Sequence, residues 1–149
     1  MGNTKSIGVA YSDQDIDGGT IGAVTPSTIV GTTVYATTEI GYTAAAQGAV
    51  TQLTDKSTGV TLNKSAGRIT MNNAALAGNT AVSFTMNNTS ISTSDTIIVN
   101  VSGGATTGAY TSYVTSMTSG SAILTLRNLT SGSLSEAVIL NYSIIHGAS

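Results

Sequence analysis

The stretch SDQDIDG is the place where this chain gathers charge: Asp13, Asp15 and Asp17 alternate, and Gly18 follows. Oxygen ligands at alternate positions before a glycine match the first half of an EF-hand calcium loop. An EF-hand that starts at Asp13 also needs a bidentate glutamate at its twelfth position, and that position is Val24. The EF-hand interpretation therefore fails. A looser calcium loop built from the three aspartates stays open as an alternative.

A second interpretation treats the same segment as a docking arm. In an extended chain, Asp13, Asp15 and Asp17 share one face and Ile16 lies on the other. Three like charges in a row deter self-pairing of an exposed strand edge. Tyr11 and Ile16 would add apolar contact if the segment lay along a neighbouring chain. We therefore expect these five residues to bind a partner, and we expect no metal site.

The remaining titratable residues do not form a recognisable catalytic set. A hydrolytic triad needs a nucleophile, a base and an orienting acid, and the only histidine, His146, is the fourth residue from the end of the given sequence. We interpret it as part of a solvated tail. The absence of cysteine excludes disulfides and thiolate metal sites. The other carboxylates are dispersed along the sequence: Glu39, Asp55, Asp95 and Glu136. We expect neither an enzyme nor a cofactor.

The composition indicates a polar but nearly uncharged surface. Only 8% of the 149 residues are charged, with a net charge of −2, while Thr and Ser number 26 and 19. An average globular protein has about 25% charged residues. Such a surface has little electrostatic protection against association, which suits a protein covered by partners or by copies of itself. The five basic residues form no patch for nucleic acid, and no apolar run is long enough to span a bilayer.

From about residue 48, apolar and hydroxyl residues alternate with a period of two, between turns rich in Gly, Ser and Asn. This pattern predicts an antiparallel β-sandwich or jelly-roll-like domain of about eight strands at residues 48–149, after an extended N-terminal arm at residues 1–47. One helix of one or two turns is expected at residues 72–78. The predicted strands are 49–55, 58–64, 67–71, 80–86, 95–101, 109–117, 121–127 and 136–145.

Phe84, the only phenylalanine, is expected between the two sheets. Its predicted neighbours there are Val82, Leu124, Leu126 and Leu140. The strand DTIIVNV, residues 95–101, is apolar on both faces. It is therefore expected either in the middle of a sheet or under another chain.

Three stretches carry a resemblance: KSTGVTLNKSAGRITMNNAALAGNTAVSFTMNN, GGATTGAYTSYV and GSAILTLRNLTSGSLSEAVILNYSIIHG. Together they resemble a module of structural proteins in tailed bacteriophages, which occurs in head decoration (cement) proteins and at the ends of fibre-like proteins. The resemblance covers about residues 48–149. The upstream stretch DGGTIGAVTPSTIVGTTV is similar to the linker before such modules in phage fibres. The resemblance implies a virion surface protein, often trimeric, and it brings no catalytic residues.

One short arm and one sandwich favour a compact cement protein over a fibre with a long shaft. We therefore expect a homotrimer on the outer surface of the capsid, bound to the major capsid protein and stabilising joints between capsid subunits. A fibre, spike or tail component that takes part in host attachment is the alternative. Neither expectation involves nucleic acid or a membrane.

Overall fold

The computed structural model describes residues 33–147. It separates a short stretch that ends at Glu39 from a compact unit that begins at Ile40, which we call the sandwich domain. Residues 33–39 have no regular secondary structure, with a bend at Thr37 and Thr38, and all of their side chains are exposed. The two parts are described separately below.

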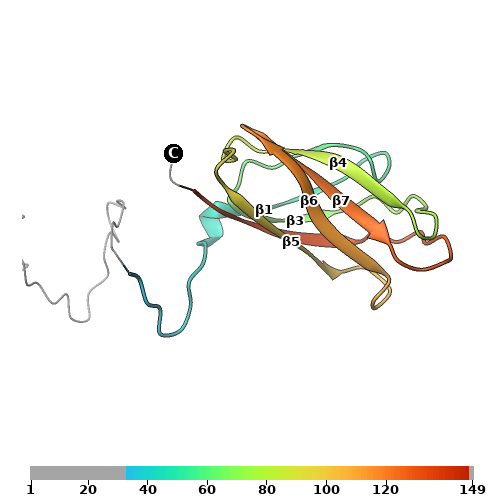
Figure 1. Cartoon of the computed structure of the whole chain (residues 1–149), viewed down its shortest axis with the longest axis horizontal. Coiled ribbons are helices and arrows are strands. Elements are labelled where there is room, and N and C mark those ends of the chain that lie inside the picture. The colour runs from blue at the N-terminus through green and yellow to red at the C-terminus, as the bar shows by residue number, and fades with distance from the viewer. Residues whose placement is uncertain (1–32, 148–149) are drawn as a thin grey trace, which may run out of the picture. The chain divides into compact units, whose positions relative to one another are not determined.

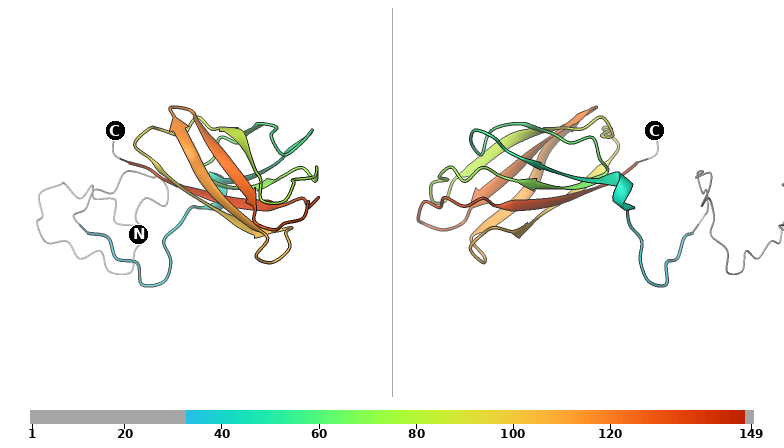
Figure 2. Two further views of the ribbon diagram at one scale, coloured as in Figure 1. Left: turned by 45° about the vertical axis from the view of Figure 1, so that its right-hand side comes forward. Right: turned by 180° about the vertical axis from the view of Figure 1, so that it is seen from behind.

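The sandwich domain consists of two four-stranded sheets that pack face to face (Figures 1 and 2). Sheet A has the strand order β1-β3-β8-β5, and sheet B has the order β2-β4-β7-β6. A single 3-10 turn, η1 (Ala44–Ala46), precedes the strands in the described residues. The strands are β1 (Gln47–Thr51), β2 (Val60–Thr61), β3 (Ala66–Thr70), β4 (Ala81–Asn87), β5 (Thr96–Gly103), β6 (Tyr110–Thr118), β7 (Ser121–Asn128) and β8 (Ile139–Ile145). The predicted all-β sandwich of eight strands is confirmed.

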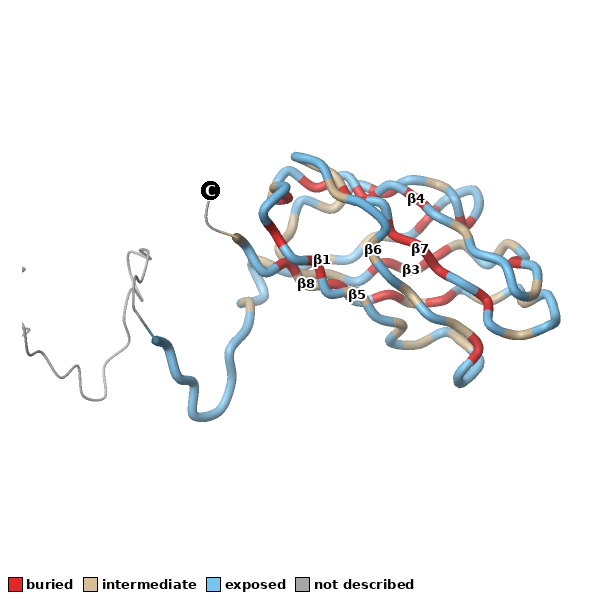
Figure 3. Tube along the Cα trace, viewed as in Figure 1, coloured by how far each residue is buried: buried red, intermediate tan, exposed pale blue. Residues whose placement is uncertain are grey.

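The period of two explains which side chains reach the core. In β4, Phe84 and Met86 are buried, while Ser83 and Thr85 point to solvent. Figure 3 shows buried positions interspersed with exposed ones along the strands. The predicted neighbours of Phe84 are all in the core: Leu124, Leu126 and Leu140 are fully buried, and the half-buried Val82 packs against them. The rest of the core consists of Val60, Ile69, Met71, Leu76, Ile91, Ile97, Ala122, Val138, Tyr142 and Ile144.

The strand pairings differ in one respect from the expected antiparallel pattern. The pairs β3–β8, β5–β8, β4–β7 and β6–β7 are antiparallel, whereas β1 pairs with β3 and β2 with β4 in parallel. The first four strands alternate between the two sheets: β1 and β3 pair in sheet A, and β2 and β4 pair in sheet B. A jelly roll is made of antiparallel Greek keys. The first half of this domain instead consists of two interleaved parallel crossovers.

The helix expected at residues 72–78 does not form. The Asn72 side chain accepts a hydrogen bond from the Ala74 N–H at 2.8 Å, which offers the backbone a turn in place of a helical start. Leu76 then exchanges two backbone hydrogen bonds with Leu134 in an isolated bridge, at 2.9 and 3.1 Å. Pairing with this distant loop residue therefore overrides the weak helix propensity of the short segment.

The strand β5 is not in the middle of a sheet, because it forms the edge of sheet A with β8 as its neighbour. Its inner face carries Ile97, which is buried, and the partly buried Val99 and Val101. Its outer face carries Ile98, of which 53% is exposed. The apolar side chain on the outer face is therefore uncovered in the single chain, and the other expectation, that this strand lies under another chain, stays a prediction.

A close approach between β1 and β3 depends on glycine. A Cβ atom at Gly67 would lie 2.7 Å from Cδ2 of Leu62 and 2.9 Å from the carbonyl oxygen of Gly48. Leu62 thus fills the space beside Tyr142, whose hydroxyl donates to the carbonyl oxygens of Leu62 and Lys64 at 3.3 and 3.0 Å. Burial raises the pKa of Tyr142 to about 12, because the phenolate would lose its hydration.

Candidate functional site

An apolar groove of about 550 Å³ lies at the outer face of sheet A. Ile98 of β5 faces Ser143 of β8 in the strand register, and Ile145 follows two residues later on the same face. The exposed fractions are 53% for Ile98 and 56% for Ile145. The full lining is Ile40, Gly41, Tyr42, Ile98, Ser143, Ile145 and His146. We call this set the sheet A groove.

The segment before η1 forms one wall of the groove and is held to β8. The half-buried Tyr42 donates a hydrogen bond from its hydroxyl to the carbonyl oxygen of Ile144. The Gln47 side chain donates to the Tyr42 carbonyl oxygen at 2.8 Å. Ile40 stands next to this anchor with 84% of its surface exposed. The groove is therefore built by a fixed backbone but is not filled by a side chain of its own domain.

His146 closes one end of the groove and is tied to a buried carboxylate, so it is not part of a free tail as expected. Its Nδ1 atom lies 3.2 Å from Oδ2 of Asp95, and the Asp95 side chain is 1% exposed. Asp95 also accepts hydrogen bonds from the backbone N–H and hydroxyl of Ser92, at 2.8 and 2.9 Å, and from the Gly147 N–H at 3.0 Å. The hydrogen bond from the Ser92 backbone is the main cause that lowers the pKa of Asp95 to about 2.

The other ring nitrogen of His146, Nε2, lies 3.4 Å from the Ser65 hydroxyl, so serine, histidine and aspartate stand in the order of a hydrolytic triad. A hydrolase also needs N–H donors that converge on the developing oxyanion. Ser65 immediately precedes β3, which pairs with β1 on one side and β8 on the other, so the N–H groups of the strand are used in the sheet. The Lys64 N–H donates to Leu62. The contacts of Ser65, His146 and Asp95 are therefore better explained as structural hydrogen bonds that fix the end of β8 to the turn before β5.

A second buried polar cluster joins four loops. Lys56 is 3% exposed, and its ammonium donates to the carbonyl oxygens of Asn72 and Glu136, each at 2.5 Å. Burial lowers the pKa of Lys56, and the nearby Glu136 carboxylate opposes that shift. Glu136 accepts two hydrogen bonds from Thr106, which lower its own pKa. The Lys56 ammonium and Oε1 of Glu136 are thus engaged in hydrogen bonds that fix the loops.

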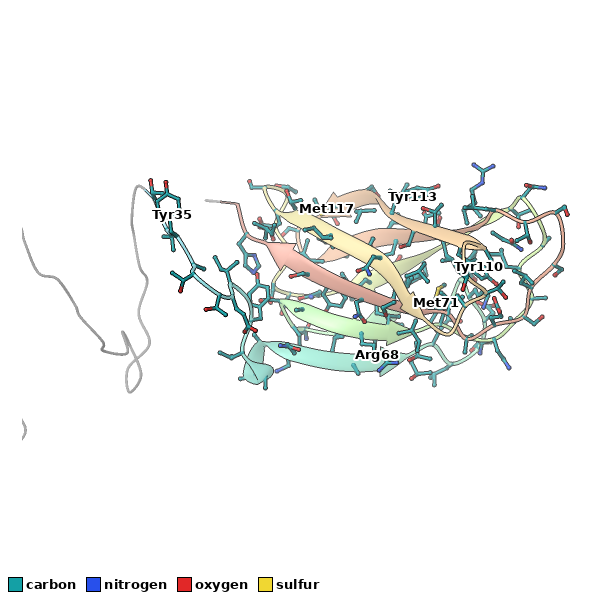
Figure 4. All side chains as sticks on the ribbon, turned by 90° about the horizontal axis from the view of Figure 1, so that it is seen from below. Tyr35, Arg68, Met71, Tyr110, Tyr113 and Met117 are labelled. Carbon is teal, nitrogen blue, oxygen red and sulfur yellow. The ribbon has the colours of Figure 1, made fainter. Side chains whose placement is uncertain are left out.

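Tyr110 borders this cluster near the same end of the sandwich as Met71, as Figure 4 shows. Burial raises the pKa of Tyr110 to about 12, and the neighbouring Glu136 carboxylate adds to the shift. The Tyr110 hydroxyl and Oε2 of Glu136 are both buried, and neither makes a hydrogen bond of ordinary geometry. This end of the domain is therefore tightly packed around polar atoms.

The outer face of sheet B carries hydroxyl groups in place of an apolar groove. Thr125 is buried there between the hydroxyls of Ser83, at 2.7 Å, and Thr115. Tyr113 projects from the same face with 45% of its surface exposed (Figure 4). Among the described strand residues of this face, Arg127 carries the only charge. The face is mostly polar and nearly uncharged.

The predicted partner-binding residues lie outside the described residues: Tyr11, Asp13, Asp15, Ile16 and Asp17. The docking interpretation and the calcium alternative both stay predictions. Within residues 33–147, no three His, Asp or Glu side chains are grouped so that they could hold a metal ion. No helix in that part of the chain is long and apolar enough to cross a membrane.

No family model, curated protein or solved structure matches the chain. The functional residues must therefore be inferred from geometry and chemistry. The sequence pointed to Ile98, because DTIIVNV is apolar on both faces. It gave no comparable signal for Tyr42 or Ile145, since nothing in a linear pattern shows that residues 42 and 145 come together at the end of β8.

Proposed function

We propose that this protein is a structural component of a phage virion, a decoration (cement) protein that binds the outer surface of the capsid as a homotrimer. The sequence resemblance supports the virion assignment. The observation that carries the self-association is the uncovered sheet A groove, where Ile40, Ile98 and Ile145 are each more than half exposed on a well-packed domain. Contiguous exposed apolar surface of this kind marks interaction sites.

The distribution of charge supports the same proposal. The carboxylates of Asp95 and Glu136 and the ammonium of Lys56 are engaged inside the domain. The strand residues on the outer faces of the sheets are therefore mostly hydroxyls, amides and a few apolar side chains, with Arg68 and Arg127 as the charged groups. Surfaces of this composition resist association weakly, so several copies can sit close together on one particle.

The outer face of sheet B favours a second candidate function, a fibre, spike or tail component that contacts the host. Tyr113 stands exposed among the hydroxyls of Ser83, Thr115 and Thr125 on that face. A surface with an exposed aromatic side chain and many hydroxyls suits a polar, uncharged ligand. In this alternative, sheet B makes the functional contact and the groove serves only assembly.

The proposal is tested with the full-length protein and two single substitutions. Ile98→Asp places a charge in the groove and should convert trimers to monomers in light scattering. Thr85→Asp places the same charge on the exposed outer face of β4 and should leave the trimer intact. Quantifying the protein in purified particles should give hundreds of copies on the head. A monomer both in solution and on the particle would contradict the homotrimer, and a few copies at the tail would favour the second candidate.

A further inference from the structure

The described residues before the sandwich domain contain apolar side chains that nothing in their own part of the chain covers. Val34 is 66% exposed and Tyr35 is 91% exposed. Their neighbours in the stretch TTVYATT, residues 32–38, carry no charge. We call Val34 and Tyr35 the arm anchor. The sandwich domain has the complementary feature, an apolar groove whose isoleucines are uncovered.

We propose that the arm anchor of one copy occupies the sheet A groove of a second copy. This inference rests on the proposed self-association and names the contact that holds the copies together. Apolar surface on the arm and apolar surface in the groove both gain from leaving water. The groove volume of about 550 Å³ suits a site that takes more than one side chain.

The side chains that line the groove favour the arm anchor as its occupant over the aspartate-rich stretch earlier in the sequence. The groove floor is formed by Ile98 and Ile145, and burying an unpaired carboxylate against them would be costly. Tyr35 has an apolar ring with a polar tip, and Ser143 and His146 line the groove with groups that can hydrogen-bond a phenol. Val34 and Tyr35 therefore match both the apolar floor and the polar end.

The segment between the arm anchor and the sandwich domain is long enough for the arm anchor to bind the groove of another copy. Four residues separate Tyr35 from Ile40, and an extended segment of that length spans up to roughly 17 Å. A contact in which one patch of a chain meets a different patch of the next is heterologous, and it forms a closed ring when the rotation allows. Three copies, each giving its arm anchor and receiving another, would satisfy every groove in a trimer.

Cysteine cross-linking tests the inference directly, because the chain contains no cysteine. Full-length Tyr35→Cys and full-length Ile98→Cys, one of them carrying a mass tag, are mixed and oxidised. A disulfide-linked dimer with one chain of each kind is expected. Tyr35→Cys mixed with Thr85→Cys is the matched control and should give no such dimer, since Thr85 lies on the outer face of the other sheet. Absence of the mixed dimer for the first pair would refute the exchange.

The double variant Tyr35→Cys/Ile98→Cys separates exchange from folding back of the arm. Covalent dimers and trimers support exchange, whereas a monomer with an internal disulfide overturns it. A second readout avoids cysteine: Tyr35→Ala should weaken self-association roughly tenfold or more, and Tyr35→Phe much less. An unchanged trimer in Tyr35→Ala without cross-links would refute the arm contact and leave the proposed self-association standing. A wild-type monomer in solution and on particles would refute both.

Discussion

Truncation of Phe84 should clearly lower the free energy of unfolding of the sandwich domain. Phe84 is 3% exposed and lies in β4 opposite Leu124 of β7, within the cluster that joins the two sheets. Alanine removes the ring and leaves a cavity, because fully buried neighbours such as Leu126 belong to strands paired on both sides and can collapse only in part. Large-to-small changes of this kind cost about 3–5 kcal/mol.

That loss should lower the melting temperature by roughly 10–20 °C for a domain of this size. The assay is chemical unfolding of the full-length protein followed by circular dichroism, with the midpoint and slope fitted separately. Phe84→Leu keeps most of the volume and should cost less than about 1.5 kcal/mol. Tyr113→Ala is the matched surface control, since Tyr113 is an exposed aromatic on the same sheet.

The reasoning would be refuted if Phe84→Ala unfolded at the same denaturant concentration and temperature as wild type. It would also be refuted if Phe84→Ala and Tyr113→Ala lost equal stability. Either result would mean that the inner face of β4 does not contribute the contacts described.

Three further predictions concern titration and the arm. Asp95→Asn should lower the melting temperature at neutral pH. Because the folded pKa of about 2 is below the ordinary 3.8, the stability that the Asp95 carboxylate contributes is present above pH 3.8 and fades towards pH 2. The difference in melting temperature between variant and wild type should therefore narrow towards pH 2. Tyr142 has a folded pKa of about 12 against an ordinary 10, so its contribution to the free energy of unfolding is present below pH 10 and is lost as the pH rises to 12. The free energy of unfolding of Tyr142→Phe should therefore fall less than that of wild type between pH 10 and pH 12. Deleting residues 1–22 should leave the sandwich folded but greatly weaken binding to capsids, and normal decoration by the truncated protein would refute the docking arm. If a chelator instead lowers the melting temperature of the full chain and calcium restores it, the three aspartates are ligands.

The strands could be predicted because each has a core side and a solvent side, which leaves a period of two in the sequence. β8 shows this most plainly, with Leu140, Tyr142 and Ile144 buried and Asn141 exposed. The order of the strands leaves no such trace. The side chains of β5 are compatible with a central or an edge position, and the chain alone does not show that β8 is its only neighbour in the sheet.

The candidate site was harder to predict than the fold for a related reason. His146 and Asp95 are 51 residues apart in the sequence, and the pairing of β5 with β8 is what brings them to 3.2 Å. The segment that begins at Asn72 shows that a local pattern can also mislead. A local side-chain hydrogen bond and a backbone bridge to the distant Leu134 both act against the helix that the short segment suggests. Local patterns therefore predicted elements, while the site depends on contacts between elements.

Most carboxylates of the sandwich domain are engaged in hydrogen bonds within it, which bears on how copies could bind one another in the proposed self-association. Lys56, Glu136 and Asp95 hold loops and strand ends, and Asp55 is occupied in a turn by hydrogen bonds from Ser57 and Thr58. Arg68 projects from the outer face of sheet A (Figure 4), but no groove-lining side chain is an acid that it could pair with. Charge steering between sandwich domains is therefore weak, and salt, which screens exposed charges over about 10 Å, should affect their association little. In the proposed self-association, specificity would then come from the shape and apolar surface of the groove. The aspartate row of the arm stays the charged feature that we expect to bind a different partner.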